Sequence, residues 1–306
     1  MTGCGFSYET AFVFKYNPME SKICVITGAN AGIGKETALT LAQKGFFIIL
    51  ICRNPEKGEQ ALRDIRAASS QNLHDLFIAD FADLNAVDAM TTALRQKYNR
   101  IDVLINNAGL FHSKRSYTKD GIELLFQVNY LAPFMLTLRL LDLLKQSPNA
   151  RIINVSSVGH YFGNIYFKDL FLEKGRYDGL KMYNQTKLAN VLFSFELARR
   201  LAGTGITVNA LSPGMVNTNI PYKNAKGLYP FLWTLSKPFL RNLAKGAETS
   251  VYLASAAEVA GISGKYFYNC KAVWSAVISK NEAVAAKLWT LSEQLLEKHY
   301  KTIIVR

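Results

Sequence analysis

The stretch Thr27-Gly28-Ala29-Asn30-Ala31-Gly32-Ile33-Gly34-Lys35 follows an apolar run and leads directly into a helical pattern. Glycines at such a junction permit a tight turn, let the backbone approach a pyrophosphate, and leave the N–H groups of the helix N-terminus to bind an anion. The spacing is GxxxGxG, not the GxGxxG of the common dinucleotide fingerprint. Because an alternating β/α pattern follows, the stretch predicts a nucleotide-cofactor loop rather than an ordinary strand-to-helix turn.

Apolar, β-rich runs alternate with helical patterns along the rest of the chain, an order typical of a parallel sheet with crossover helices. The first two runs are almost continuously apolar, as expected for strands buried on both faces. We therefore predict a Rossmann-type, doubly wound, seven-stranded parallel α/β sheet flanked by helices on both faces. Its strands are predicted at residues 23–27, 46–52, 75–79, 103–106, 152–156, 206–211 and 265–268. Its helices are predicted at residues 33–44, 55–68, 85–98, 119–145, 179–202, 245–256 and 281–299.

The length and composition favour one domain with a large core. A chain of 306 residues hides roughly 75% of its unfolded surface, and 49% of the residues are hydrophobic. Neither a repeat nor a Ser/Gly-rich linker divides the sequence, so we predict a single domain over residues 21–306 after an N-terminal extension, residues 1–20. The extension carries Glu9 and Lys15 and lacks the apolar core of a signal peptide or the ~20 apolar residues of a membrane span. With four cysteines and no CxxC pair, the chain is expected in a reducing, cytoplasmic location.

The chain is strongly basic, with a formal net charge of +13. This charge is compatible with phosphorylated ligands, nucleic acid and anionic membrane surfaces, and it does not choose among them. A nucleic-acid partner is not expected, because the sequence has no recognition motif and no sustained basic and aromatic stripe. A metal is not expected either, because the four histidines have no ligand spacing among themselves or with the cysteines.

The residues after the second predicted strand indicate which nicotinamide cofactor is bound. An acidic side chain there would accept hydrogen bonds from the adenosine ribose 2′-OH, whereas this chain has Arg53 followed by Asn54. Arg53 favours a 2′-phosphate, and Lys35 can add a second positive charge. The alternative interpretation of Arg53 is a solvated surface arginine. The predicted cofactor is NADP(H).

Further candidates follow the third and fourth predicted strands. Asp80 is placed to hold the adenine edge, although an ordinary loop aspartate is the alternative. Asn106, Ala108 and Gly109 close the fourth strand, where small residues let the backbone meet the cofactor. Cofactor contacts at several strand ends agree with the rule that open α/β sheets bind ligands at the carboxyl ends of their strands.

A candidate acid/base pair lies on the predicted helix 179–202. Tyr183 and Lys187 are four residues apart, so their side chains share one face, and an adjacent ammonium stabilises a phenolate. The fifth strand ends near Ser157, whose hydroxyl can donate to a carbonyl oxygen as charge develops. Asn129 lies on a long apolar helix, where an amide needs a partner, and a buried structural asparagine is its alternative interpretation.

Taken together, these motifs resemble the short-chain dehydrogenase/reductase superfamily, from about Ser21 to Tyr268. Within it, the strings TGANAGIGKETA, CRNPEKGE, INNAG, NVSSVGH, TKLANVLF and GKYFYNCK are similar to the retinol dehydrogenase-like branch. The segment between Ser157 and Tyr183 is longer than in most of the superfamily, as is typical of this branch, and we expect it to form one wall of the substrate pocket. Members of the branch often carry an N-terminal membrane anchor, which residues 1–20 do not resemble.

The resemblance implies a role for each candidate. Tyr183 would donate or accept the proton, Lys187 would lower its pKa and hold the nicotinamide ribose, Ser157 would polarise the carbonyl, and Asn129 would position a water. Ser157 is chosen over Ser156 because the second serine of related NVSS strings is the catalytic one. The predicted catalytic residues are Asn129, Ser157, Tyr183 and Lys187. The predicted cofactor-binding residues are Gly28, Asn30, Gly32, Ile33, Gly34, Lys35, Arg53, Asn54, Asp80, Asn106, Ala108, Gly109, Tyr183, Lys187, Pro213, Gly214, Val216 and Thr218.

The segment from about 215 to 243 is expected to form a lid over the substrate. Its part 228–240 is aromatic and apolar, which argues for a lipophilic substrate, and flanking lysines and Arg241 also suit peripheral contact with the cytosolic face of an internal membrane. A core-packing or dimer-contact helix is the alternative, so a homodimer stays open. His160 is not included in the site, because Tyr183 already accounts for the proton transfer.

Two functions of different classes fit the sequence. The first is an NADP(H)-dependent oxidoreductase acting on a lipophilic alcohol/carbonyl pair, such as a retinoid, steroid, polyprenoid or fatty aldehyde. The alternative is a catalytically silent NADP(H)-sensing or interaction protein on the same scaffold, for which a damaged proton relay would be expected. The four predicted catalytic residues are all present, which favours the enzyme.

Overall fold

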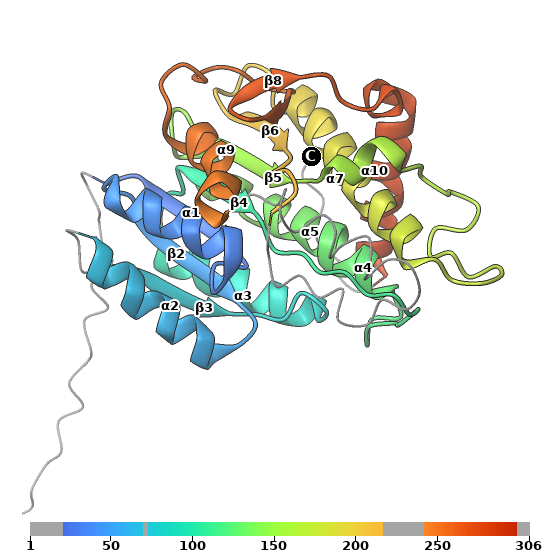
Figure 1. The fold of residues 1–306 in the computed structure, drawn as a ribbon, viewed down its shortest axis with the longest axis horizontal. Helices are drawn as coiled ribbons and strands as arrows, with labels where there is room; N and C mark the ends of the chain where they lie inside the picture. Colours follow the sequence, from blue (N-terminus) through green and yellow to red (C-terminus); the bar gives the residue numbers. More distant parts are fainter. Residues whose placement is uncertain (1–20, 70–72, 217–241, 299–306) are drawn as a thin grey trace, which may run out of the picture.

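All seven predicted strands form and run parallel, within one residue of the predicted bounds. A computed structural model describes residues 21–69, 73–216 and 242–298 of the chain (Figure 1). Within these ranges the sheet has eight strands, in the order β3-β2-β1-β4-β5-β6-β7-β8. The strands are β1 (Ile23–Thr27), β2 (Phe47–Cys52), β3 (Asp75–Ile78), β4 (Val103–Asn106), β5 (Arg151–Val155), β6 (Thr207–Leu211), β7 (Tyr266–Tyr268) and β8 (Lys271–Val273).

The eighth strand corrects the predicted seven-stranded, all-parallel sheet. β8 pairs antiparallel with β7 through a two-residue connection, Asn269 and Cys270. Both residues have positive φ, 51° and 58°, as the two central residues of a type I′ hairpin turn require. β8 is three residues long and all three are exposed, so it carries none of the apolar pattern that predicted the other strands.

Helices cover both faces of the sheet (Figure 1). Successive strand residues point to opposite layers. Val25 belongs to the larger core, shared with α3, α5, α7 and α10, whereas Cys24 and Ile26 belong to the core under α1, α2 and α9. The long helices are α1 (Gly32–Gln43), α2 (Pro55–Ala68), α3 (Leu84–Lys97), α7 (Gly179–Arg200), α9 (Leu243–Ser255) and α10 (Glu282–Glu297). Two short 3₁₀ turns, η2 (Val158–Phe162) and η5 (Val277–Lys280), were not predicted.

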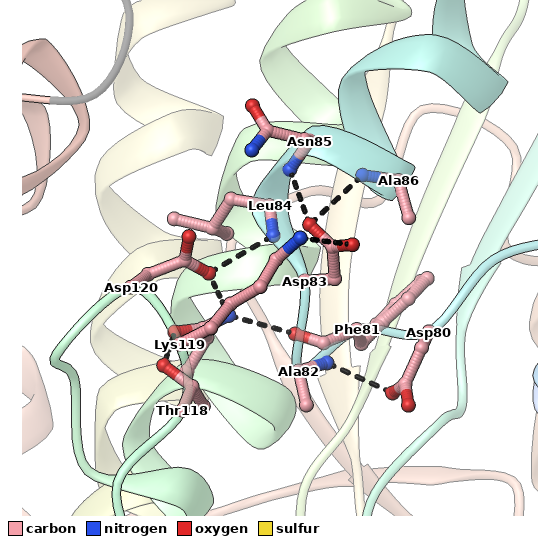
Figure 2. A network of polar contacts seen from close by, with 11 residues as sticks. Asp80, Phe81, Ala82, Asp83, Leu84, Asn85, Ala86, Thr118, Lys119 and Asp120 are labelled. Atoms are coloured by element: carbon pink, nitrogen blue, oxygen red, sulfur yellow. Dashed lines mark hydrogen bonds and ion pairs between the residues drawn. The ribbon is translucent and has the colours of Figure 1, made fainter.

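The predicted helix 119–145 is interrupted, which corrects the sequence-based boundaries. It consists of α4 (Leu124–Phe126), a π-helical segment η1 (Gln127–Leu131), α5 (Ala132–Arg139) and α6 (Leu141–Lys145). The start is delayed because Gly121 forms a turn at φ 71° and the Glu123 side chain caps the amide of Phe126. Figure 2 shows Lys119 and Asp120 bound instead to Asp83 and to the amide of Leu84 at the start of α3.

Proline explains the π-helical segment. In an α-helix the amide of residue 133 would bond to the carbonyl of Asn129, but Pro133 has no N–H to donate. The side chain of Asn190, on α7, donates to this carbonyl at 3.0 Å instead. The irregular turn therefore ties the Asn129 backbone to the helix that carries Tyr183 and Lys187.

Candidate active site

The glycine-rich turn lies between β1 and α1 and depends on the absence of side chains. Gly28 and Gly32 have positive φ, 66° and 56°. A Cβ atom on Gly34 would lie 2.4 Å from the carbonyl oxygen of Gly28 and 2.4 Å from the amide nitrogen of the Asn107 side chain. Only glycine permits this approach, which begins α1 directly against the end of β1.

The N-terminus of α1 is suited to an anion. Within the described residues, no side chain caps this helix, and its first turn holds no acidic residue. Unpaired amides and the helix dipole favour a phosphate at such an end. A pyrophosphate is compatible with this turn, because Gly28, Asn30 and Gly32 are all partly exposed.

Asn107 and Thr27 hold this turn against the end of β4, and neither was among the predicted site residues. The Asn107 side chain donates to the carbonyl of Thr27 at 2.9 Å. The Thr27 hydroxyl accepts hydrogen bonds from the amides of Asn107, at 3.0 Å, and Ala108, at 2.9 Å. Asn107 is the second asparagine of the Asn-Asn-Ala-Gly motif, so the sequence did contain a sign of it. Spacing alone, however, does not say which of the two asparagines turns toward the glycines.

Arg53 and Asp80 lie at neighbouring strand ends. The Arg53 side chain is 69% exposed, and its Nη1 atom lies 3.9 Å from a carboxylate oxygen of Asp80. The other Asp80 oxygen accepts from the amide of Ala82 and shapes the turn into α3 (Figure 2). Arg53 is thus accessible to a phosphate. Its ion pair with Asp80 is long, so a phosphate can replace the Asp80 carboxylate as its partner.

Lys35 and Asn54 have local partners in the structure. The Lys35 ammonium donates to Asp64 of α2 at 2.5 Å and lowers the pKa of that carboxyl group. Asn54 caps α2 by accepting a hydrogen bond from the amide of Lys57 at 2.8 Å. Asn54 follows β2 closely, whereas Lys35 lies in the first turn of α1 and would have to be shared with Asp64 in order to bind a cofactor phosphate.

Asn106 turns away from the glycine turn into the protein interior. Its side-chain amide donates to Thr137 at 2.9 Å and to Asn154 at 2.8 Å, and Asn154 in turn donates to Ser194. This buried network joins β4, β5, α5 and α7. The Asn106 side chain is therefore committed to the scaffold, and only its backbone is available to a cofactor.

Tyr183 and Lys187 share one face of α7, as the spacing predicts. The ammonium of Lys187 lies 5.5 Å from the centroid of the Tyr183 ring and donates to the carbonyl of Val155 at 3.1 Å. Lys187 is buried, and desolvation lowers its pKa from 10.5 to about 8. The Tyr183 ring is partly exposed and packs edge-on against Phe111.

Ser157 and Tyr183 come from segments in direct contact. A Cβ atom on Gly159 would lie 3.6 Å from the Tyr183 ring and 2.4 Å from the Asn184 side chain, so η2 packs closely on the start of α7. The Ser157 hydroxyl accepts a hydrogen bond from the Gly159 amide at 3.2 Å, which leaves its proton for donation. The Ser156 hydroxyl is buried and donates to the Lys187 carbonyl at 2.7 Å, which favours Ser157 for substrate contact.

Asn129 crosslinks the end of β4 to α7. Its side chain accepts from the amide of Leu110 at 2.8 Å and donates to the Leu110 carbonyl at 2.9 Å and to Thr186 at 3.3 Å. A Cβ atom on Gly109 would lie 3.4 Å from both the Asn129 side-chain oxygen and the Lys187 ammonium. Gly109, Asn129 and Lys187 therefore meet at one point beside the Tyr183 helix.

The segment after β6 brings two more predicted residues to the glycine turn. Gly214 has a φ of 81° and turns the chain so that Val216 becomes buried. A Cβ atom on Gly246 would lie 2.7 Å from Val216 and 3.3 Å from Ile33 of α1. Pro213 precedes this turn, whereas Thr218 and most of the predicted lid, from 217 to 241, lie outside the described residues.

In the described ranges no group of three or more His, Cys, Asp or Glu side chains could hold a metal ion. No helix in that part of the chain has both the length and the apolar character needed to cross a bilayer.

Comparison with known proteins assigns the family. The sequence model of the family described as short chain dehydrogenase matches residues 22–227. Retinol dehydrogenase 12 of Mus musculus is 42% identical over 90% of this chain and 86% of its own length, and human retinol dehydrogenase 13 is 42% identical over 90% and 84%. A crystal structure of an uncharacterised protein from Mycobacterium paratuberculosis superimposes with a TM-score of 0.73, at 33% identity, over 90% of this chain and 93% of the other. This chain therefore belongs to the short-chain dehydrogenase family, in its retinol dehydrogenase-like branch.

Proposed function

We propose that this protein is an NADP(H)-dependent oxidoreductase that interconverts a lipophilic alcohol and its aldehyde or ketone. The observation that carries the proposal is the meeting of Tyr183, Lys187 and the Ser157 segment at the carboxyl ends of β4 and β5. A glycine turn that fits a pyrophosphate lies at the neighbouring end of β1. A hydride-transfer oxidoreductase requires both parts at one edge of the sheet.

The chain's own residues would move the proton. The nicotinamide, when bound, supplies or accepts a hydride at its C4 atom. In the reducing direction, the Ser157 hydroxyl donates to the carbonyl oxygen of the substrate, and Tyr183 gives its phenol proton to the same oxygen. Lys187, with a pKa of about 8, is mostly protonated at neutral pH, so its ammonium can stabilise the phenolate that remains.

The preference for NADP(H) is argued from charge at the end of β2. Arg53 is exposed and close to Asp80, and the second strand ends without the acidic side chain that would bind a 2′-OH. A guanidinium matches the geometry of a phosphate, and a hydrogen bond to a charged group contributes about 1.5–3 kcal/mol. Lys35 can contribute to the same phosphate to the extent that it leaves Asp64.

A lipophilic substrate is supported by the apolar, aromatic composition of residues 228–240 and by the named activity of the similar retinol dehydrogenases. The test is cofactor oxidation with NADPH and with NADH across aldehydes and ketones of increasing chain length, including retinal. We expect NADPH to be preferred and kcat/KM to rise with apolar chain length. Tight NADPH binding without turnover of any of these substrates would favour the sensor instead.

Peripheral membrane contact is proposed for residues 228–240, which include Lys237, together with the flanking cations Lys226 and Arg241. Liposome flotation tests it with vesicles containing anionic lipid. Replacing Phe231, Trp233 and Phe239 together by serine should release the protein from the vesicles. Unchanged flotation of this variant would assign the contact to another surface.

A further inference from the structure

His160 is a buried imidazole to which the proposed chemistry gives no role. It lies on η2, three residues after Ser157, and its side chain has no exposed surface. Its Nδ1 atom lies 2.7 Å from the carbonyl oxygen of Ser157, and its Nε2 atom lies 3.2 Å from the amide nitrogen of Ala276. The two ring nitrogens therefore join the serine segment to the chain that follows β8.

These two contacts fix the tautomer. The Ala276 amide can only donate, so Nε2 must be the unprotonated nitrogen of a neutral ring. Nδ1 then carries the proton and donates it to the Ser157 carbonyl. Protonation of Nε2 would set its N–H against the N–H of Ala276.

Aromatic rings hold the imidazole in place. Its centroid lies 3.9 Å from that of Tyr161 and 4.3 Å from that of Tyr266, and the Tyr266 hydroxyl also points to the Ser157 carbonyl at 3.4 Å. These phenols are the titratable groups that pack on the ring, and burial raises the pKa of both, so they stay neutral. Desolvation lowers the pKa of His160, in agreement with a neutral ring.

We propose that His160 is a positioning residue, whose Nδ1–H bond to the Ser157 carbonyl sets the direction of the Ser157 hydroxyl. The inference rests on the proposed function, because the hydroxyl matters only if it meets a substrate oxygen. His160 itself is buried and touches no reacting atom. Its effect should therefore fall on kcat and leave cofactor binding unchanged.

Two amide variants separate the two hydrogen bonds. In His160→Asn the side-chain NH₂ takes the place of Nδ1 and can still donate to the Ser157 carbonyl. In His160→Gln the longer side chain puts its oxygen near the place of Nε2, so that it keeps the bond from Ala276 and loses the side-chain bond to Ser157. The Ser157 carbonyl then keeps the bond from the backbone amide of residue 160. We expect kcat to fall at least ~10-fold in His160→Gln, as for a small misplacement of a reacting group, and to be largely restored in His160→Asn. The Kd for NADPH should stay unchanged in both.

A second buried histidine gives a matched control. His74 accepts a hydrogen bond from the amide of Ile48, in β2, at 3.2 Å. It directly precedes β3, the edge strand, which β2, β1 and β4 separate from β5. His74→Gln should lower the melting temperature without changing kcat. If His160→Gln is folded and keeps the wild-type kcat, or if His160→Asn is no better than His160→Gln, the proposal is wrong.

The tautomer provides a readout that needs no substrate. In ¹⁵N NMR of the wild-type protein, His160 should be in the neutral, Nδ1-protonated form at pH 6.5, where free histidine is half protonated. Ala276→Pro removes the opposing N–H, at a φ of −52° that proline accepts, and should raise the pKa of His160, because the neutral ring loses the hydrogen bond that favours it. An Nε2-protonated ring in the wild type would overturn the proposal. A wild type that turns over no substrate but holds the expected tautomer would instead contradict the proposed function.

Discussion

The ammonium of Lys187 lies 5.5 Å from the centre of the Tyr183 ring and is held there by the carbonyl of Val155. Tyr183 and Lys187 are one turn of α7 apart, which sets the distance between their side chains. The Val155 carbonyl, at the end of β5, sets the direction of the amine. The site thus keeps a buried cation beside a partly exposed phenol. This arrangement has a cost in stability, because a charge is removed from water.

The first prediction concerns that cost. A pKa lowered from 10.5 to about 8 means that the protonated Lys187 destabilises the folded chain by roughly 3 kcal/mol. Lys187→Met removes the charge and the bond to Val155, so the variant should be more stable than the wild type by about 2 kcal/mol at pH 7. Urea unfolding of the cofactor-free proteins measures the difference.

The sign of the pH dependence follows from the same values. Between pH 8 and 10.5 the unfolded chain binds a proton at Lys187 that the folded chain does not, so the wild type gains stability as the pH rises through this window. Lys187→Met lacks this gain, and its advantage should shrink toward pH 10.5. An advantage that stays constant with pH would show that desolvation of the amine is not its origin.

Thr27 is predicted to hold the cofactor turn. Thr27→Val keeps the shape of the side chain but removes the hydroxyl that accepts from the part-buried amides of Asn107 and Ala108, of which the Asn107 amide also bonds to the Ile105 carbonyl. The free energy of unfolding should fall by about 2 kcal/mol, and the Kd for NADPH should rise, because the turn loses its anchor to β4. Thr27→Ser keeps the hydroxyl and serves as the control. Equal Kd values for the two variants would remove the hydroxyl from the account.

Arg53 is predicted to read the 2′-phosphate. Arg53→Asp should lower kcat/KM for NADPH and raise it for NADH, since the new carboxylate repels the phosphate and accepts from a 2′-OH. Arg63→Asp makes the same charge change on the exposed face of α2, where Arg63 donates to Gln60. If both substitutions change the ratio of kcat/KM for NADPH to kcat/KM for NADH equally, net charge rather than a specific contact determines the cofactor preference.

Much of the fold could be predicted because buried parallel strands carry a strong apolar signal. The runs ending at Thr27 and Cys52 are buried along their whole length and match the predicted strands closely. β8 gave no such signal, since Lys271, Ala272 and Val273 are all exposed. Its turn uses Asn269 and Cys270 in a conformation for which glycine is the usual marker.

The candidate site was predictable where helix periodicity sets the geometry and not where a strand end does. Four-residue spacing is enough to put Tyr183 and Lys187 on one face. For Asn106 and Asn107, however, one residue decides whether the side chain enters the buried network or reaches the glycine turn. Likewise, the effect of Pro133 on the Asn129 carbonyl depends on Asn190, which is far away in the sequence.

The central claim is that the Tyr183 phenol is the proton donor, and Tyr183→Phe tests it most directly. The substitution removes one oxygen and leaves the ring that packs on Phe111. NADPH oxidation with a long-chain aldehyde should slow at least ~10²-fold, as expected for the loss of a positioned acid, while the Kd for NADPH and the melting temperature stay close to those of the wild type. Turnover near the wild-type rate in a folded, NADPH-binding Tyr183→Phe protein would contradict the account.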